Sequence, residues 1–319
     1  MPRHPLLIIV LIAFFSGCSN WGPATQPDHV LAGIHDFGVT ALAYSPDGQR
    51  LISGGFQGEV RIWDVPTQRL LGEGHLHSSA VRAILPLDSD NFVSGGDDGR
   101  LVRWQQNAVK AQVKTADVTA LAQFQGRVVS GHDDRQLRVW SADTLKADRT
   151  IWLDGKVVAL SANDKLLAVG LDQAILLLKA NFETVRVIPV SRTPHDLQFS
   201  PDGRTLAAGG WFRLSLWDVA SGAERSIPTE HHGLLTSISF SPDGRYLATL
   251  GRHTDSAIRV LDTADFSLVQ RYQAHELCGA MIRFSPDGKQ LASASDDESV
   301  RLYRTVTFQP SSGAIPSAH

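Results

Sequence analysis

The sequence has few cysteines, no excess of basic residues and no sustained helical periodicity. Its 319 residues include two cysteines, with 30 Lys and Arg against 33 Asp and Glu, for a formal net charge of −3. So few cysteines exclude a disulfide-stabilised scaffold, and the charge balance gives no basic footprint for a nucleic acid. The sequence also lacks a phosphate-binding glycine loop and a Cys-x-x-Cys-His haem motif. We therefore expect no cofactor and no nucleic-acid partner.

The longest apolar run lies at the start of the chain. Leu6–Phe15 contains ten apolar residues, and as a helix it would rise about 15 Å, half of a bilayer core of roughly 30 Å. A basic residue, Arg3, precedes the run, and the small residues Ser16 and Gly17 follow it. This pattern is typical of a secretory signal peptide rather than of a membrane-spanning helix.

The residue after this segment is Cys18, and the whole leader resembles that of bacterial lipoproteins. The resemblance implies a signal peptide over residues 1–17 and a lipid on Cys18, although Phe15 stands where that family prefers leucine. The alternative is an ordinary cleaved signal with a chance cysteine. Ser19 and Asn20 are not the aspartate associated with inner-membrane retention, so the outer membrane, facing the periplasm, is the expected location. Cys278 would then have no disulfide partner, and we expect a small buried hydrophobe rather than a reactive thiol.

One short pattern repeats along the rest of the chain. Ser94–Trp104 reads SGGDDGRLVRW, a strand, a tight acidic turn and a second strand, and the same frame returns at Ser53–Trp63, Ser130–Trp140 and Ser293–Tyr303. The residues at the tryptophan position are 36 to 44 apart; they are Trp63, Trp104, Trp140, Leu178, Trp217, Leu261 and Tyr303. Seven units of three or four short strands predict an all-β propeller. We expect residues 18–29 to be a tether and residues 307–319 to be disordered.

The repeats resemble those of WD-repeat (WD40) β-propellers over about residues 30–306. The motifs that carry the resemblance are the Trp-Asp pairs at Trp63 and Trp217 and four Ser-Pro-Asp-Gly turns beginning at Ser45, Ser200, Ser241 and Ser285. The resemblance implies a seven-bladed ring closed by an N-terminal strand. Val30–Ala32 is placed for that role, because the last unit lacks a convincing fourth strand. Closure would remove the unpaired strand edges.

The resemblance also implies a buried relay of hydrogen bonds from tryptophan through serine and histidine to aspartate. The second unit has all four residues, and the seventh has a tyrosine in place of tryptophan; the two sets are His77, Ser94, Asp98 and Trp104, and His275, Ser293, Asp297 and Tyr303. The first unit has Gln57 at the aspartate position, and the third has Lys114 at the histidine position. Such residues could suggest a hydrolase. An active site would occur once, so the recurring set indicates architecture, and we predict no catalytic residue.

A metal site is a second functional interpretation of the histidines, beside the hydrolase. His231 and His232 lie near His253 and Asp255, but the spacing matches no recognised ligand pattern. His231 also falls on the histidine position of the relay. We therefore predict no metal.

The fifth unit departs most from the pattern. Trp211 takes the place of the turn aspartate, Phe212 follows it, and Ala207 replaces the serine. The aromatic pair either fills the space left by the missing relay or forms a binding surface at the channel mouth. Together with other residues on the same predicted rim, it gives the candidate partner-binding set of Phe56, Arg82, Asp97, Asp133, Trp211, Phe212 and Asp296.

We predict a non-enzymatic scaffold that docks another protein, periplasmic or membrane-bound, on the top face of the propeller. By itself the chain is expected to be a monomer. Two alternatives stay open: a small-molecule-binding or enzymatic propeller that uses the central channel, and an accessory lipoprotein of outer-membrane assembly.

Overall fold

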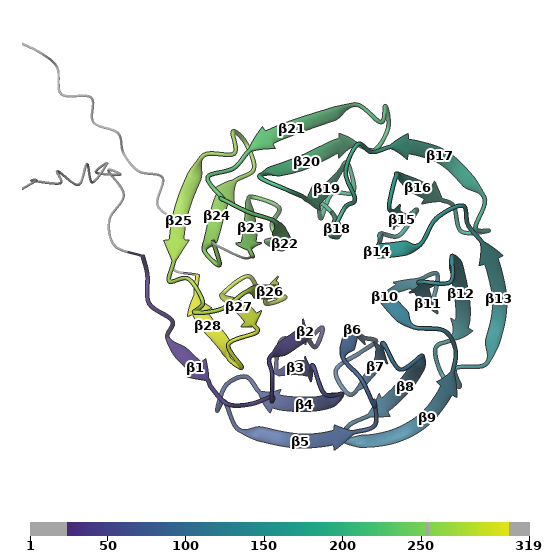
Figure 1. Ribbon diagram of the computed structural model, residues 1–319, viewed down its shortest axis with the longest axis horizontal. Coiled ribbons are helices and arrows are strands. Elements are labelled where there is room, and N and C mark those ends of the chain that lie inside the picture. The colour runs from purple at the N-terminus through teal and green to yellow at the C-terminus, as the bar shows by residue number, and fades with distance from the viewer. Residues whose placement is uncertain (1–23, 253–254, 306–319) are drawn as a thin grey trace, which may run out of the picture.

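The computed structural model describes residues 24–252 and 255–305, and Figure 1 views it along the axis of a ring. Seven antiparallel sheets of four strands each surround a central channel. The described ranges contain no helix, and therefore none long and apolar enough to cross a membrane. The prediction of an all-β, seven-bladed propeller is confirmed.

The strands follow one another outward within each blade, and the next blade then begins at the channel (Figure 1). The first three blades contain β2 (Val39–Tyr44), β3 (Arg50–Gly55), β4 (Glu59–Asp64) and β5 (Leu70–His75); β6 (Val81–Pro86), β7 (Asn91–Gly96), β8 (Arg100–Gln105) and β9 (Ala108–Lys114); and β10 (Val118–Phe124), β11 (Arg127–His132), β12 (Gln136–Ser141) and β13 (Ala147–Trp152). The fourth and fifth contain β14 (Val157–Ala162), β15 (Leu167–Leu171), β16 (Ala174–Leu178) and β17 (Thr184–Pro189); and β18 (Asp196–Phe199), β19 (Thr205–Gly209), β20 (Arg213–Asp218) and β21 (Glu224–Pro228). The last two contain β22 (Leu235–Phe240), β23 (Tyr246–Gly251), β24 (Ile258–Asp262) and β25 (Leu268–Tyr272); and β26 (Gly279–Phe284), β27 (Gln290–Ser295), β28 (Val300–Arg304) and, from the N-terminal end of the described chain, β1 (His29–Leu31).

The ring is closed by β1, as predicted. This strand pairs antiparallel with β28, with Val30 opposite Arg301, and it begins one residue earlier than expected. The chain just before it is also fixed, because the N–H of Thr25 donates to the carbonyl of Arg271 at 3.0 Å and its carbonyl accepts from Gln273 at 2.8 Å. Closure therefore gives the outer edge of the seventh blade the same four strands as the others.

The four Ser-Pro-Asp-Gly turns share one local structure. In the first, the hydroxyl of Ser45 donates to Asp47 at 2.6 Å and accepts from the N–H of Arg50 at 2.9 Å. Gly48 has a φ of 71°, a left-handed conformation that glycine adopts without steric cost. These contacts fix the hairpins locally and place all four turns at the same end of their blades.

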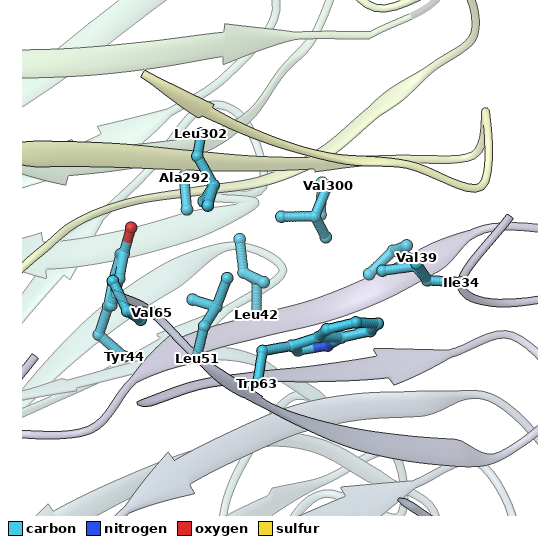
Figure 2. Close-up of a cluster of buried hydrophobic side chains, with 11 residues drawn as sticks. Ile34, Val39, Leu42, Tyr44, Leu51, Trp63, Val65, Ala292, Val300 and Leu302 are labelled. Carbon is cyan, nitrogen blue, oxygen red and sulfur yellow. The ribbon is translucent and has the colours of Figure 1, made fainter. Parts of the chain in front are cut away.

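The hydrophobic core lies between neighbouring blades. Figure 2 shows Leu42 and Trp63 of the first blade facing Val300 of the seventh. Burying side chains of this size contributes about 1.5–3 kcal/mol each. The seam between the two ends of the chain is therefore held by side-chain packing as well as by the pairing of β1 with β28.

Two faces follow from the antiparallel order. The turns between second and third strands, and the connections from one blade to the next, lie at one end of the blades, here called the top face. The Ser-Pro-Asp-Gly turns, between first and second strands, lie at the other end, here called the bottom face. The connections carry the relay histidines, so the relays lie toward the top face.

Candidate functional site

The second blade contains an uninterrupted chain of hydrogen bonds. The indole N–H of Trp104 donates to Ser94 Oγ at 2.9 Å, Ser94 Oγ lies 2.8 Å from His77 Nε2, and His77 Nδ1 lies 3.0 Å from Asp98 Oδ1. A carboxylate only accepts, so Nδ1 carries the proton and Nε2 accepts from the serine hydroxyl. Asp98 also accepts from the backbone N–H of Ser78 at 3.0 Å. The chain ties two strands, a turn and the connection from the preceding blade into one unit.

Burial sets the protonation states of this relay. Burial holds the pKa of His77 below its usual value, against the opposing effect of Asp98. Burial also acts to raise the pKa of Asp98, but the hydrogen bonds from His77 and Ser78 outweigh it and hold that pKa below its usual range. A neutral imidazole beside an ionised carboxylate is therefore the resting state, which matches the direction of the hydrogen bonds.

The order Ser94, His77, Asp98 matches the atoms of a catalytic triad, and burial decides against that chemistry. Ser94 has 0% and His77 2% of its surface exposed. A nucleophile with no accessible surface cannot reach a substrate. Ser94 is also held by the indole of Trp104, so both of its hydrogen-bonding directions are used within the fold.

The seventh and first blades repeat the chain with changes. His275 Nε2 lies 2.7 Å from Ser293 Oγ and its Nδ1 lies 3.0 Å from Asp297, whose pKa these hydrogen bonds hold well below the usual range although burial opposes them. In the first blade His35 Nε2 lies 2.9 Å from Ser53. With Gln57 at the aspartate position, His35 Nδ1 has no hydrogen-bond partner among the described residues. Burial and then Arg61 lower the pKa of His35 to about 3.

The third blade corrects the sequence analysis, which found no histidine for its relay. His132 lies on the same strand as Ser130, and its Nε2 is 2.7 Å from Ser130 Oγ, which also accepts from Trp140 at 2.7 Å. Burial lowers the pKa of His132 to about 4. Residues two apart on a strand share a face, and that spacing is the signal that could have identified it.

The sixth blade places His231 in a relay and not in a cluster of metal ligands. His231 Nε2 lies 2.9 Å from Thr249 Oγ1, and its Nδ1 lies 2.8 Å from Arg259 Nη1 and 3.2 Å from Asp255 Oδ2. A guanidinium at the imidazole disfavours a cation there. His253 lies outside the described residues.

The fourth and fifth blades lack the relay. The fourth has Val169 and Leu178 at the serine and tryptophan positions, both buried. The fifth keeps Trp217, which is 3% exposed, but Ala208 is at the position of its serine, because it pairs with Ser215 as Ser53 pairs with Arg61. The predicted Ala207 is wrong, since the turn to β20 is one residue shorter and Ala207 lies on the opposite face of the sheet, in the cluster with Leu216. Among the described residues the indole N–H of Trp217 has no hydrogen-bond partner.

The predicted rim residues all lie in turns or at strand ends of the top face, and several are paired. Arg82 contacts Asp97 at 2.6 Å, and Asp296 contacts Arg252 at 3.3 Å. The N–H of Asp133 donates to the carbonyl of Asp117 at 3.4 Å. Burial, and then Asp133 and Asp97, raise the pKa of Asp117, which identifies an acidic area over the second and third blades.

Trp211 and Phe212 form the turn between β19 and β20. Their ring centroids lie 5.9 Å apart and their side chains are 41% and 49% exposed. Phe212 has a φ of 61° and donates its N–H to Gly233 at 2.9 Å. The carbonyl of Trp211 accepts from Arg192 at 3.1 Å.

A second exposed aromatic group of the top face was only half anticipated. Phe56 was predicted, but Phe37, 69% exposed with a φ of 66°, was missed. The two are neighbours, because the N–H of Phe56 donates to the carbonyl of Gly38 at 3.1 Å. The backbone of Asp296 also packs against Gly38. The Phe37-Gly38 pair, which lies in a connection between blades, is the sequence feature that could have identified Phe37 as an exposed residue of the top face.

Cys278 lies in the same region and differs from its prediction. It is partly exposed rather than buried, and its carbonyl accepts from the N–H of Asp296 at 3.0 Å and from Ser295 Oγ at 3.0 Å. Exposed Leu277 precedes it. The connection carrying Cys278 is therefore held by backbone hydrogen bonds to the turn at Ser295 and Asp296.

The central channel was the site proposed for the alternative function. A cavity of about 430 Å³ lies there, lined by residues of the innermost strands. It is lined by an ion pair between Asp196 of the fifth blade and Arg283 of the seventh, 3.2 Å apart. Asp196 Oδ2 also accepts from Ser237 Oγ of the sixth blade at 2.8 Å and from the N–H of Ile238 at 3.1 Å. These contacts tie the innermost strands of three neighbouring blades together.

These observations define a closed β-propeller with a repeated tryptophan relay. Comparison with known families agrees: residues 26–64, 185–218, 224–262 and 266–304 match the family described as "WD domain, G-beta repeat". The protein is therefore a seven-bladed β-propeller with WD40 repeats. Residues 65–184 lie between matched segments, and the structure gives them the second and third blades and the first three strands of the fourth, in the same form as the others.

Curated relatives share parts of the sequence. Periodic tryptophan protein 2 of Arabidopsis thaliana is 24% identical over 288 residues, which are 89% of this chain and 28% of that protein. The guanine nucleotide-binding protein subunit beta of Oryza sativa subsp. japonica is 31% identical over 201 residues, 56% of this chain and 53% of that protein. Human cilia- and flagella-associated protein 52 is 24% identical over 239 residues, 72% of this chain and 33% of that protein. The chain thus spans about half of these relatives' length at most.

Proposed function

We propose that the protein is a non-enzymatic scaffold that docks a partner protein on its top face. The observation that carries the proposal is the pair of exposed phenylalanines, Phe37 and Phe212, in left-handed turns. Holding a residue with a Cβ in this conformation costs about 1–2 kcal/mol of conformational free energy. Because the two rings are exposed, burial of apolar surface within the fold does not offset that cost. Strain of this kind at a surface turn points to a functional role.

The surroundings of both rings suit a protein interface. Phe56 lies beside Phe37, and Trp211 lies beside Phe212. Aromatic anchors with charged residues around them are typical of binding hot spots, and the Arg82–Asp97 and Arg252–Asp296 pairs lie on the same face. Since closed blades hold these turns in place, little ordering entropy is lost on binding.

We further propose that Cys18 is lipidated and anchors the protein in the outer membrane, facing the periplasm. Cys18 and the leader lie outside the described residues, so this rests on the sequence. The described chain joins the ring at the outer edge of the sixth and seventh blades, where Thr25 is bonded to β25. Such an attachment leaves the top face open to a partner in the periplasm or in the membrane.

Crosslinking in intact envelopes tests the docking face. The wild type is compared with a Phe37→Ala/Phe56→Ala variant, a Trp211→Ala/Phe212→Ala variant, and a Leu70→Ala/Leu71→Ala control. Leu70 and Leu71 are 44% and 42% exposed and begin the outermost strand of the first blade, toward the bottom face, so they match the loss of apolar surface at another place. We expect the top-face variants to lose a crosslinked species that the control keeps. If both top-face variants keep every species, the docking proposal is wrong.

Fractionation tests the anchor. Cys18→Ala is expected to move the protein from the membrane to the soluble periplasmic fraction. A Cys278→Ala variant is the matched control and should stay with the membrane. Membrane retention of the Cys18→Ala variant would overturn the lipid anchor while leaving the docking proposal unaffected.

A further inference from the structure

The fifth blade contains a cavity where the other blades have their relay. It measures about 400 Å³ and lies beneath the connection from β17 to β18, with Trp217 among its lining residues. Trp217 also belongs to the core cluster between the fourth and fifth blades. The cavity therefore lies at the junction of these two blades, on the side of the relay.

Small residues at three positions account for this space. In the first blade Leu42 pairs with Ser53 and lies seven residues after His35; in the fifth, Leu197 pairs with Ala208 and lies seven residues after Val190. Ala208 is thus at the serine position, and Val190 takes the place of the relay histidine; both line the cavity. Two residues before the relay tryptophan, or before the residue that replaces the tryptophan, four blades have an arginine; these are Arg61, Arg138, Arg259 and Arg301. The fifth blade has Ser215 at that position. An imidazole, a hydroxyl and a guanidinium are all missing.

The tryptophan has nevertheless kept its polar group. In the first three blades the equivalent indole N–H donates to a serine at 2.7–3.0 Å. Trp217 is 97% buried, since 3% of its surface is exposed, and its N–H has no acceptor among the described residues. A buried donor without a partner costs about 1–3 kcal/mol. A ligand oxygen in the position of the missing relay would remove that cost.

The charges around the cavity are unevenly distributed. Arg192 and Arg213 line it; Arg192 donates to the carbonyl of Trp211 at 3.1 Å and Arg213 to the hydroxyl and carbonyl of Ser226, and no ion pair joins either arginine to a carboxylate of the described residues. Glu224, the acidic residue of the lining, is paired with Trp217 on β21. It therefore lies about 13 Å from Arg213 along the strand, at roughly 3.3 Å per residue. Two guanidinium groups and one distant carboxylate suit a ligand with a single negative charge at the top-face end.

We propose that this cavity binds a carboxylate, on a ligand of one or two amino-acid residues in size. The carboxylate lies between Arg192 and Arg213, because guanidinium groups match its geometry, and an acceptor oxygen reaches the indole N–H of Trp217. The volume lies within the range of ligand pockets, about 300–1,000 Å³. The proposal does not rest on docking at the top face, since Phe37 and Phe56 do not line this cavity.

The carboxylate can come from a small molecule or from an acidic side chain of a peptide. Glutarate and the peptide acetyl-Ala-Glu-Ala-amide are the two probes, with glutaramide and acetyl-Ala-Gln-Ala-amide as their uncharged counterparts. Binding is followed on the indole N–H resonance of Trp217 in the full chain, identified by its disappearance in Trp217→Phe. We expect a saturable shift with one or both acids at up to about 10 mM, the weak end of specific affinity, and none with the amides. A shift with the peptide alone identifies a protein source.

Two variants and a control complete the test. Val190→His combined with Ala208→Ser restores the relay and fills the cavity, so binding should be lost while the fold is kept. Arg213→Gln should weaken binding about tenfold or more. Arg204→Gln is the control, because Arg204 is exposed and does not line the cavity. No shift with either acid, equal shifts with acids and amides, or unchanged binding in the filled variant would each overturn the proposal.

Discussion

Replacing Ser94 by alanine is the sharpest test of the relay. The hydroxyl of Ser94 is the acceptor for Trp104 and the partner of His77, at 2.9 and 2.8 Å. Removing it leaves two buried polar groups without partners, because Trp104 and His77 are each 2% exposed. At about 1–3 kcal/mol for each group, we expect Ser94→Ala to lower the free energy of unfolding by about 2–6 kcal/mol.

The assay is urea unfolding, with hydrogen exchange of the Trp104 indole N–H as a local readout. Ser78→Ala is the control, because Ser78 is an exposed serine of the same relay region that contributes a backbone N–H. The control should change the unfolding free energy by less than about 0.5 kcal/mol, as is usual at surface positions. If Ser94→Ala and Ser78→Ala are equally stable, and the indole N–H exchanges no faster, the relay does not hold the blade together.

The fifth blade allows the opposite change. Ala208 pairs with Ser215 as Ser53 pairs with Arg61, and it lies on the face of the sheet that carries Trp217. Ala208→Ser therefore supplies the missing acceptor, and we expect the unfolding free energy to rise by about 0.5–1.5 kcal/mol, the net value of one hydrogen bond. A destabilised Ala208→Ser would show that the Trp217 indole is already satisfied or that a hydroxyl does not fit there.

Three further changes follow from the structure. His132 is neutral in the fold, with a pKa of about 4 against 6.5 when unfolded. Between these values the unfolded chain binds more protons than the folded one, so the free energy of unfolding should fall by on the order of 3 kcal/mol as the pH falls through this window. When unfolding is measured over this pH range, His132→Gln should show a shallower pH dependence than a His75→Gln control. Phe212→Gly should relieve backbone strain and raise the unfolding free energy by up to about 1 kcal/mol, while weakening partner crosslinking. Deleting residues 24–31 should expose the edge of β28, lowering the unfolding temperature and causing concentration-dependent association on size exclusion.

The architecture was predictable because short local sequence motifs determine its turns and strands. The Ser-Pro-Asp-Gly turns use a side-chain hydrogen bond and a left-handed glycine that operate within six residues, as Ser45 and Gly48 show. Seven copies then set the number of blades. Closure could also be predicted, because a seventh unit without a fourth strand requires one from elsewhere, and Val30 supplies it.

The candidate site was less predictable, because its features depend on residues distant in sequence. His132 was missed since it reaches Ser130 along its own strand instead of from the connection between blades. Phe37 was missed because its exposure depends on the packing of Gly38 against Asp296. The cavity needs three substitutions, at Val190, Ala208 and Ser215, that become one feature when the strands are paired.

The fourth and fifth blades show two ways of losing a relay, and the difference between them supports a ligand in the fifth. The fourth blade replaces the serine and the tryptophan by Val169 and Leu178, which are 0% and 1% exposed, and no polar group is left behind. Replacing both partners of a buried hydrogen bond by apolar groups is nearly neutral in free energy. The fifth blade keeps a buried indole N–H without its acceptor, beside a cavity lined by two arginines. An apolar solution was open to this fold, since its neighbour uses it. A donor retained at a cost of about 1–3 kcal/mol is best explained by an acceptor that arrives from outside the chain.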